Sequence, residues 1–161
     1  MDSFFVNLYK EAGDSSFQAL RKVKKHFNIK KAGHLGTLDP LARGVLPLAF
    51  GEATKLIQYT PIEPKIYKVE IKFGAFSKTL DSEGVNDEDI ISVDKPSNFQ
   101  KNLNIFLKNM LGELSQVPPK YSAVKINGKR AYKKAREGED FKIQPRKVNF
   151  LSYKNLDIIW P

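Results

Sequence analysis

Residues 33–47 combine glycines, prolines, a histidine and an arginine with one carboxylate among mostly apolar neighbours. Loops that only connect elements are usually polar and lack such a mixture. The single carboxylate is Asp39, and Pro40 restricts the backbone beside it. The flanking Leu38 and Leu41 predict that this carboxylate is partly buried. Asp39 is therefore either a nucleophile or general base or a turn aspartate that caps local N–H groups.

Four further side chains can contact a substrate, and each has an ordinary alternative: Lys10, His34, Lys55 and Tyr67. The histidine is a general base, a ring that stacks on a base, or a surface residue. The tyrosine is either part of the core or an aromatic platform for a nucleobase. The two lysines are either phosphate contacts or solvated side chains. Arg43, four residues after the aspartate, is a possible partner that keeps a buried carboxylate ionised.

The charge distribution favours a polyanionic partner. The chain has 161 residues, enough for one domain with a core, and a formal net charge of +9. Six basic residues and no acidic one lie in 21–31, ten basic and three acidic residues lie in 120–147, and acidic residues gather in 81–94. Segregated positive charge suits nucleic acid, because each neutralised phosphate releases counterions. The alternative is a solvated, lysine-rich surface.

Composition also narrows the class of protein. There is no cysteine and there are two histidines, so we expect neither disulfides nor a metal centre. We expect no membrane span, because no run of about 18 apolar residues occurs. The first residues lack the features of a signal peptide, and the absence of cysteine fits a reducing cytosol. The sequence gives no oligomeric state, and a monomer is the default expectation.

The elements that must position these residues follow from periodicity and capping. Strands are predicted at residues 4–10, 45–50, 66–73, 121–126, 147–153 and 156–160. Capping boxes predict helices that start after Ser15 (with Gln18) and Ser97 (with Gln100). Their predicted buried stripes are Phe17, Leu20, Val23 and Phe27 in the first helix and Phe99, Leu103, Phe106 and Met110 in the second. Shorter helices are predicted at 52–59 and 129–136, with a turn at Asn127-Gly128. The mixture, without a βαβ rhythm, indicates an α+β domain with a mixed sheet.

Several blocks together resemble the TruB family of tRNA pseudouridine synthases. Residues 33–47 read GHLGTLDPLARGVLP and 51–55 read GEATK, which is similar to the signature of that family. Residues 65–67 resemble its K-x-Y strand, and 79–84 its T-x-D-x-x-G turn. Residues 118–132 resemble its P-P-x-Y-S-A-x-K-x-x-G-x-x-x-Y block. The blocks follow the order of the family and run through nearly the whole chain.

The resemblance implies isomerisation of uridine 55 in the T loop of tRNA to pseudouridine, without a cofactor, on a mixed, mostly antiparallel sheet with flanking helices. Asp39 matches the catalytic aspartate, which attacks either the uracil ring or the ribose. Tyr67 matches the tyrosine that stacks on the flipped uracil, and His34 the histidine that helps fill the vacated stack. Lys55 matches a lysine near the substrate. A base within a folded loop must be extruded before its glycosidic bond can be reached.

Two departures from the family pattern limit what the resemblance implies. Residues 10–13 read KEAG where the family has K-P-x-G, which predicts a looser wall behind Tyr67. The later strand K-G-x-Y-I-R, whose arginine pairs with the catalytic aspartate, and the small RNA-binding domain have no counterpart in residues 1–161. We therefore expect a truncated catalytic domain in which Asp39 lacks its charge partner and 156–160 form an exposed apolar edge. Three hypotheses remain: an active tRNA pseudouridine synthase, a catalytically silent tRNA-binding or tRNA-folding fragment, and a degenerate truncated product.

Overall fold

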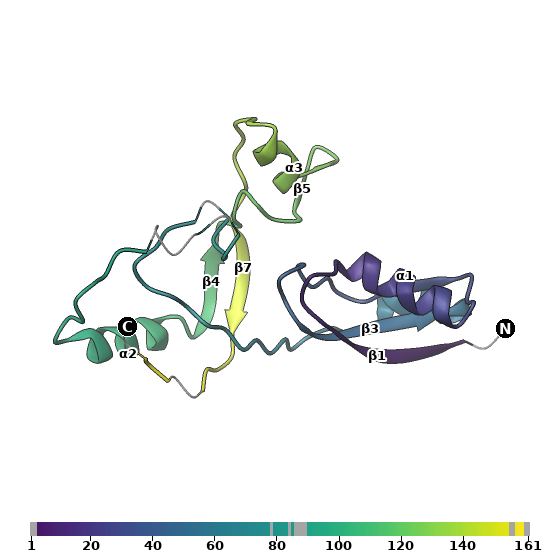
Figure 1. Cartoon of the computed structure of the whole chain (residues 1–161), viewed down its shortest axis with the longest axis horizontal. Coiled ribbons are helices and arrows are strands. Elements are labelled where there is room, and N and C mark those ends of the chain that lie inside the picture. The colour runs from purple at the N-terminus through teal and green to yellow at the C-terminus, as the bar shows by residue number, and fades with distance from the viewer. Residues whose placement is uncertain (1–2, 78, 84, 86–89, 155–156, 160–161) are drawn as a thin grey trace. The chain divides into compact units, whose positions relative to one another are not determined.

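The computed structural model describes residues 3–77, 79–83, 85, 90–154 and 157–159. The chain divides into two compact units, residues 1–69 (unit 1) and 70–161 (unit 2). Both units contain helices and antiparallel strand pairs, which confirms the α+β class (Figure 1). The described strands form three separate sheets, and every pairing in them is antiparallel. That residues 1–161 form a single domain stays a prediction.

Unit 1 is built on a three-stranded sheet in the order β1-β3-β2. Its strands are β1 (Phe4–Lys10), β2 (Ala32–His34) and β3 (Gly44–Phe50). Lys10 lies opposite Gly44 at one end of the β1–β3 pair, and His34 lies opposite Leu48 in the β2–β3 pair. The predicted strands at 4–10 and 45–50 are confirmed. Strand β2 was expected to be part of a loop.

One helix, α1 (Ser16–His26), begins at the predicted capping box. The backbone N–H of Gln18 donates to Ser15 Oγ at 3.3 Å, and the backbone N–H of Ser15 donates to Gln18 Oε1 at 2.8 Å. These two bonds satisfy backbone donors that the first turn of a helix leaves without intrahelical partners. The cap is local in sequence, which explains why the sequence alone predicts it correctly.

The core of unit 1 lies between α1 and β3, and its buried members are Ala19, Leu20, Leu46, Leu48 and Phe50. Leu20 and Val23 belong to the predicted stripe and pack here. Phe17 and Phe27 were also placed in that stripe, but their side chains are 61% and 64% exposed. Element η1 is a 3-10 helix at Gly51–Tyr59, where a short helix was predicted. A second apolar cluster joins β3 to η1, and its members are Leu35, Ala49, Ala53 and Ile57.

Residues 66–73 do not form the predicted strand, because no described strand pairs with them. The face that alternation placed in the core is exposed: Tyr67 is 71% exposed and Val69 70%. Alternation specifies which side chains share a face of a strand, whereas a ladder also needs a partner backbone.

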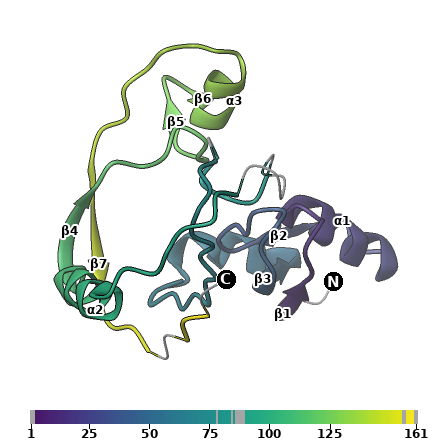
Figure 2. The ribbon, with the colours of Figure 1, turned by 60° about the vertical axis from the view of Figure 1, so that its left-hand side comes forward.

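Unit 2 contains two small sheets (Figure 2). Its elements are α2 (Phe99–Asn109), β4 (Gly112–Gln116), β5 (Lys125–Ile126), β6 (Lys129–Arg130), α3 (Ala131–Arg136) and β7 (Arg146–Phe150). Strand β4 pairs with β7, and β5 pairs with β6. Asn127 and Gly128 form the predicted turn between β5 and β6, with φ of 50° and 82°. These positive φ values are typical of two-residue hairpin turns and explain the Asn-Gly pair.

Several boundaries in unit 2 differ from the prediction. The second capping box is wrong, because α2 is capped at Asn98 without a side-chain hydrogen bond. None of its predicted stripe is fully buried, and Phe106 is 59% exposed. Strand formation at 121–126 is confined to β5, and the short basic helix starts at Ala131 because the two preceding residues pair in β6. Of the predicted strand at 156–160, only residues 157–159 are described, and they are not in a strand.

Candidate functional site

The candidate site is built on the loop that joins β2 to β3, residues 35–43. At its start, the Leu35 N–H donates to the carbonyl oxygen of Pro47 at 2.9 Å, which extends the β2–β3 ladder by one bond. Further along, the Ala42 N–H donates to the carbonyl oxygen of Asp39 at 3.0 Å. Asp39 therefore opens a tight turn within a loop whose two ends are held by the sheet.

The side chain of Asp39 is exposed, and within the described part of the chain it has no hydrogen bond or ion pair. Arg43 is exposed too and makes no ion pair with it. The prediction that Leu38 and Leu41 bury the carboxylate is wrong. Leu41 is 51% exposed, and Leu38 packs against the core of unit 1. The carboxylate is thus open to a ligand that approaches this loop.

The backbone just before Asp39 is held by Ser16, a residue that the sequence analysis did not single out. Ser16 is 2% exposed and lies in the first turn of α1. Its Oγ donates to the carbonyl oxygen of Leu38 at 3.0 Å and accepts the N–H of Leu38 at 2.9 Å. One hydroxyl can donate and accept at the same time, so it satisfies both backbone groups of one residue.

The backbone just after Asp39 is held from the end of β1. The side chain of Lys10 is 1% exposed, and its Nζ donates to the carbonyl oxygens of Glu11 (2.8 Å), Asp14 (2.7 Å) and Pro40 (3.4 Å). The Gly13 N–H also donates to the Pro40 carbonyl, at 2.8 Å. An ammonium has three donors, and all three are used here. The ammonium of Lys10 therefore holds the turn, and a contact between Lys10 and substrate stays a prediction.

His34 ends β2 and is half-buried. Its Nδ1 lies 2.5 Å from the carbonyl oxygen of Gly36. A carbonyl can only accept, so Nδ1 carries the proton and donates it. This bond fixes the orientation of the ring beside the loop and leaves Nε2 for another partner. Gly36 has a φ of 68°, which a glycine adopts at no steric cost in the turn after β2.

Lys55 lies on η1 and shares a carboxylate with another lysine. Glu52 pairs with Lys31 at 2.8 Å and with Lys55 at 2.5 Å. The hydrogen bonds from these two lysines, Lys31 first, hold the pKa of Glu52 at about 2. The hydrogen bond to Glu52 in turn raises the pKa of Lys55 above its usual range. Lys55 remains a cation with a 71% exposed side chain, and the trio carries one net positive charge.

Tyr67 belongs to unit 1, in the unpaired segment that follows η1. Its ring is mostly exposed, and no ring contact or hydrogen bond between it and the loop occurs among the described residues. The structure therefore gathers Lys10, His34 and Asp39 around one loop. It does not bring Tyr67 into contact with that loop.

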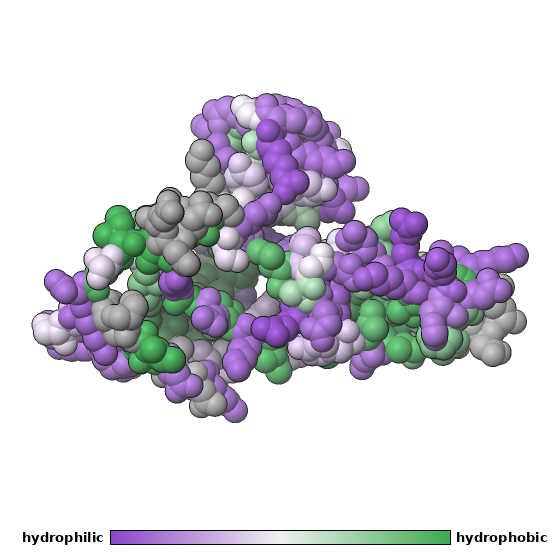
Figure 3. Space-filling view, in the orientation of Figure 1, coloured by the Kyte–Doolittle hydropathy of each residue, from purple (hydrophilic) through white to green (hydrophobic). Residues whose placement is uncertain are grey.

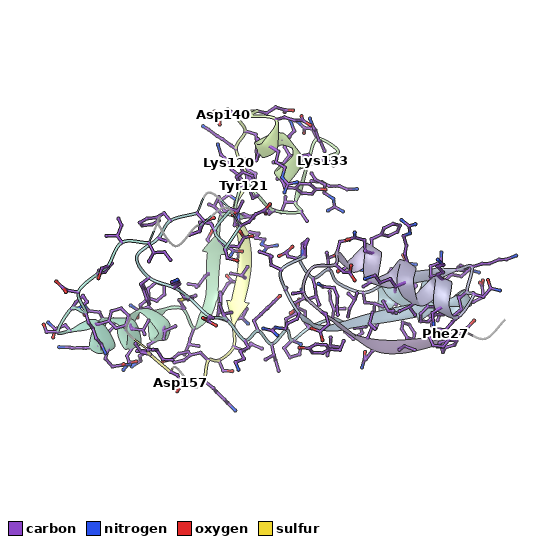
Figure 4. The ribbon with its side chains drawn as sticks, in the orientation of Figure 1. Phe27, Lys120, Tyr121, Lys133, Asp140 and Asp157 are labelled. Carbon is purple, nitrogen blue, oxygen red and sulfur yellow. The ribbon has the colours of Figure 1, made fainter. Side chains whose placement is uncertain are left out.

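Many basic side chains have no acidic partner within the described residues. On and just after α1 these are Arg21, Lys24, Lys25 and Lys30. In the segment of unit 2 around α3, Lys120 pairs with Asp140 at 3.0 Å (Figure 4). Among the described residues Lys125 and Lys133 have no such partner. Hydrophilic side chains cover the surface of that segment (Figure 3). These free cations can contact a polyanion.

Two other classes of site have no counterpart in the described residues. No group of three or more His, Asp or Glu side chains in the described ranges is arranged to hold a metal ion. None of the helices in that part of the chain is both long enough and apolar enough to span a bilayer.

Comparison with known proteins gives consistent matches. A family model described as "TruB family pseudouridylate synthase (N terminal domain)" matches residues 24–161. The tRNA pseudouridine synthase B of Wolbachia pipientis subsp. Culex pipiens is 47% identical over 150 residues, which cover 93% of this chain and 41% of that protein. The protein of the same name from Clostridium acetobutylicum is 41% identical over 156 residues, which cover 97% and 53%. A crystal structure of a Cbf5-Nop10-Gar1 complex aligns over 75% of this chain and 30% of the other, with a TM-score of 0.48 and 29% identity. The chain spans about half the length of the curated relatives it matches.

Proposed function

Because the chain belongs to the TruB family of pseudouridylate synthases, we propose that it carries the nucleophile of an enzyme that converts uridine 55 in the T loop of tRNA to pseudouridine. The observation that supports this most directly is Asp39, whose exposed carboxylate has no partner among the described residues while the backbone on both sides of it is hydrogen-bonded. A nucleophile needs this combination of a free reactive group and a fixed position.

The reaction breaks the bond between the sugar and a ring nitrogen of uracil and forms a bond to a ring carbon. No atom is gained or lost, so the chemistry needs no redox or group-transfer cofactor. In the proposed mechanism Asp39 attacks the flipped nucleotide, at the uracil ring or at the ribose, and the uracil detaches, rotates and rejoins through a ring carbon. The bond to Asp39 breaks again, the ring carbon loses its proton, and the freed ring nitrogen gains one, so the product is an isomer of the substrate. Both routes require the uridine to leave its stack, at a cost of a few kcal/mol.

Three further side chains have proposed roles with the flipped nucleotide. Tyr67 stacks on the extruded uracil, which recovers about 1–3 kcal/mol of lost stacking. Its 71% exposed ring is available for that contact. His34 helps to fill the vacated stack, with its ring oriented by the bond to Gly36. Lys55 contacts the substrate as a cation, because Glu52 favours its protonated form.

The proposed partner is the T-arm of tRNA, the proposed location is the cytoplasm, and the proposed oligomeric state is a monomer. The unpaired basic residues on and after α1 and near α3 support a polyanionic partner. Their contribution to affinity should fall with salt, because each phosphate contact releases counterions.

The test is incubation of the chain with an unmodified tRNA transcript, followed by quantification of pseudouridine in the T loop. We expect turnover that is lost in Asp39→Asn, which keeps the size of the side chain and removes its charge. The matched control is Asp94→Asn, which neutralises an exposed carboxylate in unit 2 and should leave turnover unchanged. Binding without turnover would favour the tRNA-binding alternative, and neither binding nor turnover would favour the degenerate product.

A further inference from the structure

We propose that Ser16 is a positioning residue for Asp39, because its hydroxyl restrains the backbone of Leu38, the residue just before the proposed nucleophile. This inference rests on the proposed function. Ser16 lies on α1, whereas Asp39 lies on the loop between β2 and β3, so the link is a contact between elements distant in sequence.

The first argument is the geometry of the two hydrogen bonds. Ser16 Oγ bonds to the N–H and to the carbonyl oxygen of the same residue, Leu38, at 2.9 Å and 3.0 Å. These two groups lie on either side of the Leu38 Cα, so holding both restricts φ and ψ of that residue. The Leu38 carbonyl belongs to the peptide group that leads into Asp39, and its orientation therefore fixes the start of the Asp39 backbone.

The second argument is that the hydroxyl of Ser16 is not needed by its own helix. The N-cap of α1 is Ser15, which with Gln18 completes a capping box. A serine in the first helical turn commonly bonds to local backbone groups. The Ser16 hydroxyl bonds instead to a residue 22 positions later, from a site that is 2% exposed. Because both hydrogen bonds of this buried hydroxyl go to one loop residue, they restrain the backbone of that loop.

The third argument is that no other described contact restrains the peptide group between Leu38 and Asp39. The Leu38 side chain packs against the core, but apolar packing does not specify the rotation of a peptide group. The hydrogen bonds from Lys10 and Gly13 act on Pro40, after Asp39. Without Ser16, the backbone would be held on one side of the carboxylate only. A displacement of about 1 Å at a reacting group can lower a rate by about 10²-fold.

The experiment compares Ser16→Ala with Ser15→Ala in the full chain. Both remove one hydroxyl from the start of α1, but only the first removes the bonds to Leu38. In Ser16→Ala we expect the Leu38 amide to exchange with solvent at least about tenfold faster, and the three-bond HN–Hα couplings of Leu38 and Asp39 to move toward averaged values. Pseudouridine formation should lose about 10–100-fold in kcat with less than about threefold change in KM.

Ser15→Ala should speed exchange in the first turn of α1 and leave Leu38 exchange, the backbone couplings of Leu38 and Asp39, and kcat unchanged. Ser16→Thr, which keeps the hydroxyl, should restore slow Leu38 exchange and kcat. The proposal is overturned if Ser16→Ala leaves Leu38 exchange and the backbone couplings of Leu38 and Asp39 unchanged, or if Ser15→Ala reproduces both changes. A parent chain that makes no pseudouridine would instead refute the proposed function, while the NMR measurements would still decide whether Ser16 orders Asp39.

Discussion

Replacing Lys10 by methionine distinguishes a lysine that holds the turn from one that binds phosphate. Methionine keeps an unbranched apolar stem and removes the ammonium. In the structure the ammonium makes two short hydrogen bonds, to the carbonyls of Glu11 (2.8 Å) and Asp14 (2.7 Å), and one long bond to Pro40 (3.4 Å). All three carbonyls lose this donor in the variant.

The magnitude follows from two opposing terms. A hydrogen bond to a charged group contributes about 1.5–3 kcal/mol net, so the two short bonds together contribute about 3–6 kcal/mol. Methionine avoids the cost of burying a charge, which is several kcal/mol before compensation. We expect Lys10→Met to lower the free energy of unfolding by about 2 kcal/mol, the part of the hydrogen-bond contribution that this saving does not offset.

The assay is urea unfolding followed by circular dichroism, together with tRNA affinity measured at several salt concentrations. Lys30→Met is the matched control, because Lys30 is exposed and has no acidic partner among the described residues. We expect Lys30→Met to keep the free energy of unfolding of the parent. If Lys30 contacts a phosphate, this variant also reduces the slope of log K for tRNA against log salt concentration by about 0.7–0.9. Lys10→Met should leave that slope unchanged.

The reverse pattern would refute the reasoning. If Lys10→Met keeps the stability of the parent and reduces the salt slope by about one contact, the ammonium faces the RNA and does not hold the turn. That outcome would support the alternative, open from the sequence, that Lys10 contacts a phosphate.

Three more predictions concern Glu52, Gly74 and Leu48. The lysine partners of Glu52 depress its pKa to about 2, so the contribution of these ion pairs to stability is complete above pH 4.5 and is lost as pH falls through 2. NMR titration should show a midpoint near pH 2 that rises in Lys31→Met. A midpoint near 4.5 in the parent would contradict the pairing. Gly74→Ala should lower the stability of unit 2 by about 2 kcal/mol or more, since Gly74 has a φ of 95° and a Cβ there would overlap the carbonyl oxygen of Ile91; unchanged urea unfolding would contradict this. Leu48→Ala should cost about 2–5 kcal/mol, because this side chain is fully buried in the core of unit 1, and thermal unfolding measures the loss.

Features specified by neighbouring residues could be predicted from the sequence. The Ser15–Gln18 capping box and the Asn127-Gly128 turn depend on contacts within four residues, and both are present. The first strand was predicted correctly from its apolar run. The box proposed at Ser97 failed because α2 begins one residue later, at a cap without a side-chain bond. A capping pattern shows which residue can cap a helix, but it does not require that the helix start there.

Features that depend on distant residues could not be predicted. Two acceptors of the Lys10 ammonium, Glu11 and Asp14, are local in sequence, but its third acceptor, Pro40, lies 30 residues later and could not be predicted. Ser16 gave no signal either, since a serine after an N-cap is ordinary in sequence and its partner, Leu38, is 22 positions away. Exposure of Asp39 was misjudged because the neighbouring leucines suggested burial. The middle of the predicted segment 33–47 is a loop, whereas its two ends belong to β2 and β3, and its role as a site stays a prediction.

The hydrogen bonds that restrain the loop at residues 35–43 determine when the conformational entropy of these residues is lost. Ordering a residue costs about 1–2 kcal/mol, and residues 35–43 are held by the sheet, by Ser16 and by Lys10. That cost is incurred once, when unit 1 folds, and is not added to the free energy of each encounter with RNA. In the proposed reaction the protein therefore presents Asp39 on a static backbone, and the large rearrangement at each turnover belongs to the nucleotide that leaves its stack.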